Sequence, residues 1–111
     1  GMRKAINLSK SAGVGAVAVA NSSHFGAAAY FGFEAARNDM IGLSFTHATA
    51  HVAPYKGRDP FFGNNPFCLI APSNNDAPFC LDMATTTTTF MRVARRLEAQ
   101  HLFPFATKKI Y

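Results

Sequence analysis

One histidine and one aspartate stand out in this sequence of 111 residues, because each lies shortly after a run of apolar residues. His24 comes after a polar stretch at 21–23, and Asp82 comes after apolar residues at 78–81. An imidazole with a pKa of about 6.5 suits general acid–base chemistry near neutral pH. The alternative for His24 is a hydrogen-bonded histidine at a helix start. An isolated carboxylate at a strand end is often a helix cap or a ribose-binding group, and the pattern does not separate the two.

The residues around His24 predict the elements that position it. Small and β-branched residues at 14–20, between Gly13 and the polar stretch, predict a buried strand. A helix is predicted after His24, with Ser22 or Ser23 as its N-cap, and we expect it to end near Arg37. His24 is therefore expected at a helix N-terminus on the rim of a sheet. The apolar positions with helical spacing are Phe25, Ala28, Ala29, Phe33 and Ala36.

The remaining patterns predict a small α/β domain. Residues 2–11 resemble the end of a helix that stops at Gly13, and 40–46 predicts a strand, so the order strand–helix–strand suggests a crossover unit. Residues 67–71 and 78–83 predict two strands of a hairpin. The long segment at 47–66 is rich in Pro and Gly and favours a functional loop. A helix with the stripe Phe90, Val93, Ala94 and Leu97 is predicted after the threonines at 85–89.

Two further motifs lack the context that their chemistry needs. Gly13, Gly15 and Ala18 match the spacing of a dinucleotide-binding loop, but such a loop follows a strand and opens a helix, and here the order is reversed. His47 and His51 are four residues apart and could join His24 in a metal site if they lay on a helix. Their segment does not predict a helix, so we expect no metal.

Composition limits the class of protein. The chain is 49% apolar, which favours a single domain over residues 1–111, and it contains neither a membrane-length apolar run nor a signal-peptide pattern. A cytoplasmic location is expected, with no membrane partner. The net charge is +5, but the basic residues are scattered, so no nucleic-acid partner is expected. Cys68 and Cys80 lie symmetrically about Asn74, so a hairpin could place them opposite each other; we expect two small buried thiols.

Four stretches taken together resemble the type-2 malate/L-lactate dehydrogenase family, a group of non-Rossmann oxidoreductases that includes ureidoglycolate, sulfolactate and diketogulonate enzymes. Their order and spacing agree with the family from Ala12 to about Thr86. The resemblance covers most of this chain but only the middle of a family member. The stretches are Ser22-Ser23-His24-Phe25-Gly26-Ala27-Ala28, Pro54-Tyr55-Lys56-Gly57, Gly63-Asn64-Asn65-Pro66 and Leu81-Asp82-Met83-Ala84-Thr85.

The resemblance implies hydride transfer between NAD or NADP and a 2-hydroxy or 2-keto acid such as malate or lactate. It implies a partial non-Rossmann NAD(P)-binding α/β domain, with a mixed sheet flanked by helices, that assembles as a homo-oligomer such as a homodimer. By similarity, His24 exchanges a proton with the substrate oxygen. Asp82, Met83 and Ala84 match a segment that contacts the dinucleotide, and Asn65 is a further contact.

The sequence also departs from the family pattern. A Thr is usual where Asn64 stands, and Ala48 replaces a residue whose hydroxyl can bind cofactor. The family regions on either side of this middle portion are absent from the sequence. The expectation is therefore a central piece of such an enzyme. The alternative is a catalytically inactive truncated remnant that acts only as an oligomerising interaction module.

Overall fold

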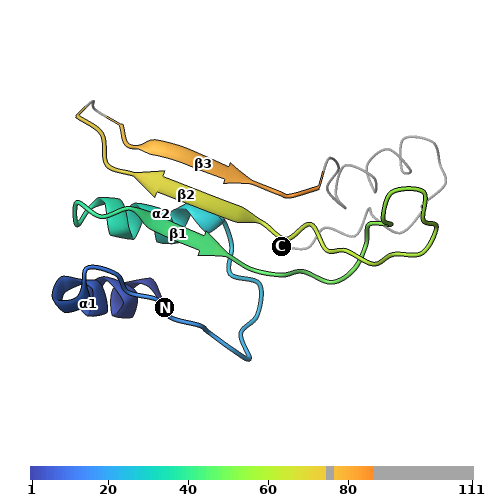
Figure 1. The fold of residues 1–111 in the computed structure, drawn as a ribbon, viewed down its shortest axis with the longest axis horizontal. Coiled ribbons are helices and arrows are strands. Elements are labelled where there is room, and N and C mark those ends of the chain that lie inside the picture. The colour runs from blue at the N-terminus through green and yellow to red at the C-terminus, as the bar shows by residue number, and fades with distance from the viewer. Residues whose placement is uncertain (75–76, 87–111) are drawn as a thin grey trace, which may run out of the picture. The chain divides into compact units, whose positions relative to one another are not determined.

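The computed structural model describes residues 1–74 and 77–86, which contain two helices and a three-stranded sheet (Figure 1). The described residues fall into two compact units. Unit 1 holds 1–46 and 66–83, and unit 2 holds 47–65 and the segment that begins at 84. Every helix and strand below belongs to unit 1. The single domain expected over residues 1–111 stays a prediction, and the helix predicted around Phe90 to Leu97 lies outside the described residues.

The first helix, α1, spans Met2–Ala12 and ends at Gly13, as predicted. Gly13 adopts the left-handed conformation, with φ 79°, and its N–H donates to the carbonyl of Ser9 at 2.8 Å. Such a glycine ends a helix without the steric cost that a side chain would incur there. Two residues on, a Cβ on Gly15 would overlap the backbone carbonyl of Ala5, so the chain folds back closely against α1. These contacts explain both glycines of the apparent dinucleotide motif.

The prediction of a strand at residues 14–20 is wrong. The segment forms no strand, and two of its three valines are exposed, Val14 at 78% and Val19 at 63%. Without this strand there is no strand–helix–strand crossover, which needs two parallel strands. A short run of small apolar residues suits an extended surface segment as well as a buried strand, because periodicity alone does not distinguish them.

The second helix, α2, spans Ala28–Ala36, so the predicted helix exists but begins later than Phe25. Its N-cap residue is Ala27, which rules out Ser22 or Ser23 as the cap. The predicted apolar stripe is confirmed: Ala28 is buried in the core, and the other four members pack against it. Gly32 and Ala35 are also buried on this helix.

The sheet contains β1 (Gly42–Phe45), β2 (Phe67–Ala71) and β3 (Phe79–Met83) in the order β1-β2-β3. Both pairs are antiparallel, so the predicted hairpin is confirmed, and the described part of the sheet is antiparallel rather than mixed. Helix α2 packs on one face of these strands, and α1 packs on α2 (Figure 1).

The register places Cys68 opposite Asp82 and Cys80 opposite Ile70. The cysteines are therefore diagonal neighbours, and the expectation that they stand opposite each other is wrong. Cys68 is buried beneath α2, as expected for a small thiol, but Cys80 on the edge strand is exposed.

Close packing of α2 on the sheet depends on small residues. A Cβ added to Gly32 would overlap the side chain of Ile70, and one added to Gly42 would lie 2.7 Å from the carbonyl oxygen of Gly32. Ile70 and Cys68, both 0% exposed, form the core together with Ala28. The backbone of α2 therefore lies almost directly against β1 and β2.

Unit 2 is held together by short-range backbone contacts. Val52 and Phe62 form an isolated antiparallel bridge, and the N–H of Gly57 donates to the carbonyl of Pro54 at 2.8 Å. This bridge closes the proline-rich segment into a loop. The sequence predicted a loop here but not its conformation.

Candidate active site

His24 lies in the loop before α2 and is exposed. Its Nδ1 accepts a hydrogen bond from the N–H of Gly26 at 3.1 Å, and Gly26 adopts a left-handed φ of 82°. Because Nδ1 is the acceptor, the neutral ring carries its proton on Nε2. The loop thus holds the imidazole in one tautomer, with Nε2–H as its donor group.

Asp82 lies on β3 and reaches the start of α2. Its Oδ2 accepts a hydrogen bond from the N–H of Ala29 at 2.9 Å. Of the two roles that the sequence left open, the helix cap is therefore present in the structure, while cofactor binding by Asp82 stays a prediction. The fold brings Asp82 to the same end of α2 that the His24 loop enters.

Met83 is the next residue on β3 and is 46% exposed. Successive side chains of a strand point to opposite faces of the sheet. The side chain of Asp82 points toward α2, so that of Met83 points to the other face. The two side chains therefore cannot contact one ligand from the same side of the sheet.

Asn65 and Ala84 belong to unit 2, where three loop segments meet. Oδ1 of Asn65 accepts the N–H of Ala48 at 2.9 Å, and the carbonyl of Asn64 accepts the N–H of Thr85 at 2.9 Å. A Cβ on Gly63 would overlap the carbonyl oxygen of Ala48, so this position requires a glycine. The structure thus brings Asn65 and the segment of Ala84 into one loop cluster, and the amide of Asn65 serves first to hold that cluster.

Ser44 is a residue of this region that sequence reasoning missed. Its hydroxyl donates to the carbonyl oxygen of Ala28 at 2.7 Å, so β1 also holds the first turn of α2. The available signal was a single polar side chain within an apolar strand. Such a residue is compatible with many roles, and its partner is set by tertiary packing.

Burial raises the pKa of the Cys68 thiol, and the nearby Asp82 carboxylate and Cys80 raise it further, while a hydrogen bond with Ser44 lowers it. A raised pKa keeps the thiol protonated at neutral pH. Cys68 is therefore a poor nucleophile, because the thiolate is the reactive form.

The other motifs lack the local structure that their chemistry needs. Residues 47–51 are not helical, and the described residues contain no group of three or more His, Cys, Asp or Glu side chains that could hold a metal ion. A polar hollow of about 280 Å³ lies between α1 and α2. Its lining includes Glu34 and Asn38, at the C-terminal end of α2, so it is not at the His24 loop.

Comparison with known proteins agrees with this arrangement of motifs. A profile described as malate/L-lactate dehydrogenase matches residues 1–106. The chain belongs to this family. Malate dehydrogenase from Pyrococcus horikoshii is 45% identical over 85 residues, which are 77% of this chain and 23% of the relative. Malate/(S)-sulfolactate dehydrogenase from Methanothermus fervidus is 39% identical over 101 residues, which are 88% of this chain and 30% of the relative.

Similarity in structure extends over the same region. The crystal structure of malate dehydrogenase from Entamoeba histolytica matches with a TM-score of 0.82 at 37% identity. The match covers 90% of this chain and 28% of that structure. The chain thus spans between a quarter and a third of its solved relative, and 23% of the Pyrococcus horikoshii enzyme. The resemblance inferred from four short stretches is confirmed.

Proposed function

We propose that this chain contributes to an oxidoreductase that transfers a hydride between NAD or NADP and a 2-hydroxy or 2-keto acid such as malate or lactate. Family membership supports the reaction class. The single observation that carries the proposal is the His24 loop, where the Gly26 N–H occupies Nδ1 and directs the proton of the neutral ring to Nε2.

The role proposed for His24 is proton exchange at the substrate oxygen. A carbonyl that gains a hydride becomes an alkoxide, and a positioned donor stabilises the charge that develops on its oxygen. Nε2–H is the donor that the loop geometry offers. His24 is exposed, so a substrate can reach it.

A nicotinamide cofactor would supply the hydride. The residues present fit such a group by their chemistry: a carboxylate accepts from ribose hydroxyl groups, and an amide donates to oxygen. Oδ2 of Asp82 is engaged by Ala29 and Oδ1 of Asn65 by Ala48. We therefore propose that Asp82 would contact the cofactor through Oδ1 and that Asn65 would contact it through Nδ2. Met83 and Ala84 would contact it through their backbone atoms.

The decisive experiment is a titration of the purified chain with NADH and with NADPH, followed by nicotinamide fluorescence. The chain contains no tryptophan, so its own emission does not interfere. Saturable enhancement supports a cofactor site, and the two titrations together choose between NAD and NADP. A folded sample without enhancement contradicts cofactor binding by this chain and favours the inactive interaction module.

Mutation of His24 tests the catalytic role. In a full-length relative, replacing the histidine that matches His24 with alanine should abolish turnover but leave cofactor binding nearly unchanged. Loss of both together would show that the residue is structural instead.

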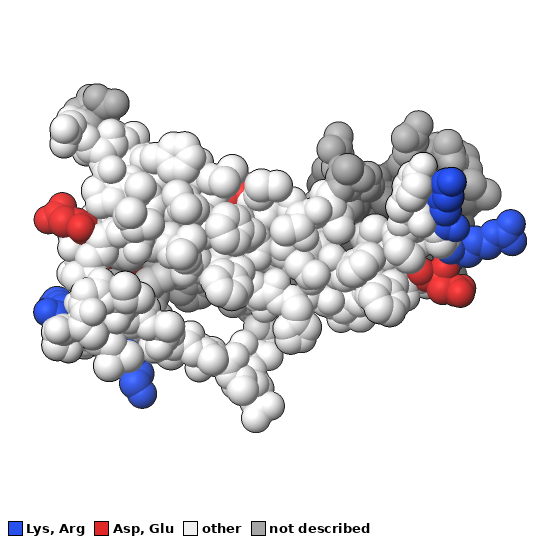
Figure 2. All heavy atoms as spheres, viewed as in Figure 1, with Lys and Arg blue, Asp and Glu red and all other residues white. Residues whose placement is uncertain are grey.

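The face of the sheet opposite α2 supports the proposal of a homo-oligomer. Its outward side chains are all apolar, and Figure 2 shows mainly uncharged atoms over the strands. The five large exposed side chains present roughly 450 Å² of apolar surface, so two copies stacked face to face would bury about 900 Å², near the lower limit for a specific interface. They are Leu43 (49% exposed), Phe45 (69%), Phe79 (56%), Leu81 (39%) and Met83 (46%).

We therefore expect weak self-association of this chain, measured by sedimentation velocity over a range of concentrations. A Phe45→Ser variant should shift the chain toward monomer, while Tyr55→Ser, at an even more exposed aromatic in unit 2 (91%), should not. A wild-type chain that stays monomeric at every concentration would exclude this interface.

We also propose a cytoplasmic location. Both cysteines are free, which is consistent with a reducing compartment.

A further inference from the structure

Helix α2 begins without a cap from its own sequence. Its N-cap residue is Ala27, whose methyl group cannot accept a hydrogen bond, and no side chain caps it locally. The first N–H groups of a helix have no partner within the helix and need acceptors from elsewhere. In most helices, Ser, Thr, Asp or Asn at the N-cap accepts from the second or third helical residue.

Asp82 supplies the missing acceptor from a distant part of the chain. Ala29 is the second residue of α2, and its N–H donates to Oδ2 of Asp82 at 2.9 Å. The carboxylate therefore occupies the place of a local N-cap side chain, although 53 residues separate the partners. A negative charge at a helix N-terminus is also favoured by the helix dipole.

A second hydrogen bond holds the same turn from another strand of the sheet. Ser44 on β1 donates to the carbonyl oxygen of Ala28 at 2.7 Å. Since β1 and β3 flank β2, the two bonds fix consecutive residues of α2 from both edge strands. The first turn of α2 is thus hydrogen-bonded to both β1 and β3.

The His24 loop is short and closely tied to this turn. His24 stands four residues before Ala28, its ring is bonded to the N–H of Gly26, and Phe25 stacks on Phe31 with ring centroids 5.3 Å apart. Phe25 also packs against the core residues beneath α2. A displacement of the first turn therefore displaces the imidazole.

We propose that Asp82 is a positioning residue for His24, which acts by capping α2 at Ala29 and, together with Ser44, fixes where the imidazole stands. The inference rests on the proposed role of His24 and adds to it a link between two of the family's motifs. It predicts that the carboxylate matters to His24 even when no cofactor is bound.

The test compares Asp82→Ala and Asp82→Asn with a matched control, Asp59→Ala, which removes an exposed carboxylate from unit 2. Two readouts by NMR need no cofactor: amide hydrogen exchange at Ala29, and the ¹⁵N shifts of the His24 ring, which report its tautomer. We expect Asp82→Ala to speed exchange at Ala29 about fivefold, the factor that corresponds to a typical N-cap, and to mix the His24 tautomers. Asp82→Asn keeps an oxygen acceptor and should restore most of both readouts, and Asp59→Ala should change neither.

The outcomes separate this inference from the proposed function. Unchanged Ala29 exchange and His24 shifts in Asp82→Ala, with weaker NADH binding, would overturn the positioning role and make Asp82 a cofactor ligand alone. If the wild-type chain binds no NADH, the proposed function fails, but the NMR readouts still decide the positioning role. Should Asp82→Ala fail to fold, Ser44→Ala carries the test, since it removes the other anchor. We then expect Ser44→Ala to mix the His24 tautomers, and His24 shifts that stay unchanged in Ser44→Ala would overturn the inference.

Discussion

The two faces of the three-stranded sheet are built from neighbouring residues of the same strands, yet they differ in what covers them. On the face beneath α2, Cys68 and Ile70 are 0% exposed. On the opposite face, Phe45 is 69% exposed and Phe79 is 56% exposed. Larger apolar side chains thus stand on the more open face, so the size of an apolar residue does not indicate which face a helix covers.

Two features of the covered face explain why α2 packs there. It carries the small residue Gly42 opposite Gly32 of the helix, which permits close approach of the two backbones. It also carries Ser44 and Asp82, the polar groups that bond the first turn of α2. The face is therefore selected by fit and by hydrogen bonding rather than by hydrophobicity alone.

The largest difference between the two faces is expected when two neighbouring residues of β2 are each replaced by alanine. Ile70→Ala should lower the free energy of unfolding by about 2–5 kcal/mol, because it leaves a cavity under α2. Leu69→Ala, on the half-buried opposite face, should cost clearly less. Urea denaturation of both variants measures the difference, and equal losses would show that both faces are covered in solution.

Gly32→Ala should have the next largest effect. In an open helix this change stabilises by up to about 1 kcal/mol, because glycine is a poor helix former. Here the added Cβ would overlap Ile70 and force the helix away from β2, which should cost about 1–3 kcal/mol. Thermal unfolding of the variant gives the sign directly, and a stabilised variant would mean that α2 does not pack this closely.

Sequence patterns predicted the parts of this fold that local chemistry determines. Gly13 marked the end of α1, the helical stripe from Phe25 to Ala36 marked the covered side of α2, and the hairpin followed from two apolar runs around a polar turn. The family followed from motifs whose spacing could be compared along the chain, whereas the catalytic role of His24 stays a prediction.

The rest depended on contacts between distant residues. The segment at 14–20 has the composition of a strand, but pairing needs a neighbouring strand, which no local pattern supplies. The cap of α2 was sought among Ser22 and Ser23, since capping residues are usually local, whereas it comes from Asp82. The hairpin register, in which Cys80 pairs with Ile70 rather than with Cys68, depends on a turn that composition does not specify.

A chemical comparison of the two thiols separates the centre of the covered face from its edge. Cys68 is buried with a raised pKa, whereas Cys80 is exposed. Iodoacetamide at pH 7.5 should alkylate Cys80 at least about tenfold faster than Cys68, because access and thiolate fraction both favour it. Because burial and the nearby Asp82 carboxylate raise the pKa of Cys68, its reactivity in the folded chain should rise only at more alkaline pH than that of an ordinary thiol. Equal rates, measured by mass spectrometry of the peptides, would contradict the close cover by α2.

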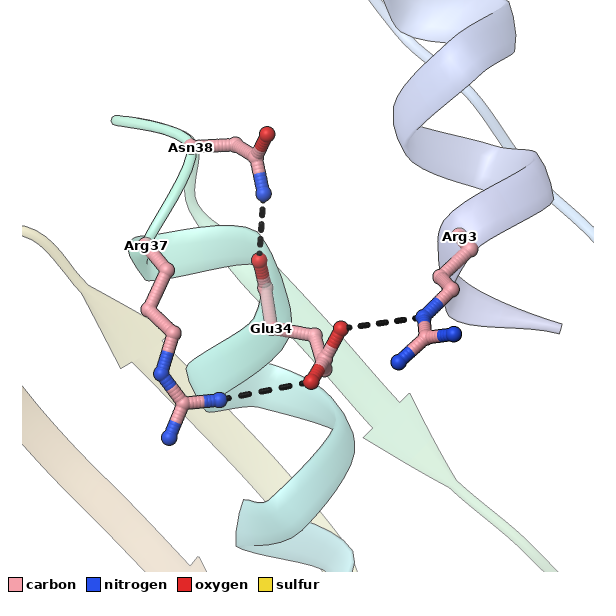
Figure 3. Close-up of polar contacts among 4 residues, drawn as sticks. All are labelled: Arg3, Glu34, Arg37 and Asn38. Carbon is pink, nitrogen blue, oxygen red and sulfur yellow. Dashed lines mark hydrogen bonds and ion pairs between the residues drawn. The ribbon is translucent and has the colours of Figure 1, made fainter.

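The smallest effect is expected on the side of α2 that faces α1, where Glu34 pairs with two arginines (Figure 3). Nε of Arg3 and Nη1 of Arg37 each lie 3.3 Å from a Glu34 oxygen, but their side chains are 83% and 68% exposed. Water screens such pairs, so Glu34→Gln should change the free energy of unfolding by no more than about 0.5 kcal/mol. About 1 M salt should remove even that difference. The bond from Nδ2 of Asn38 to the Glu34 carbonyl persists in the variant, because it uses the backbone. A loss as large as that of Gly32→Ala would mean that α1 and these ion pairs, rather than the sheet, hold α2 in place.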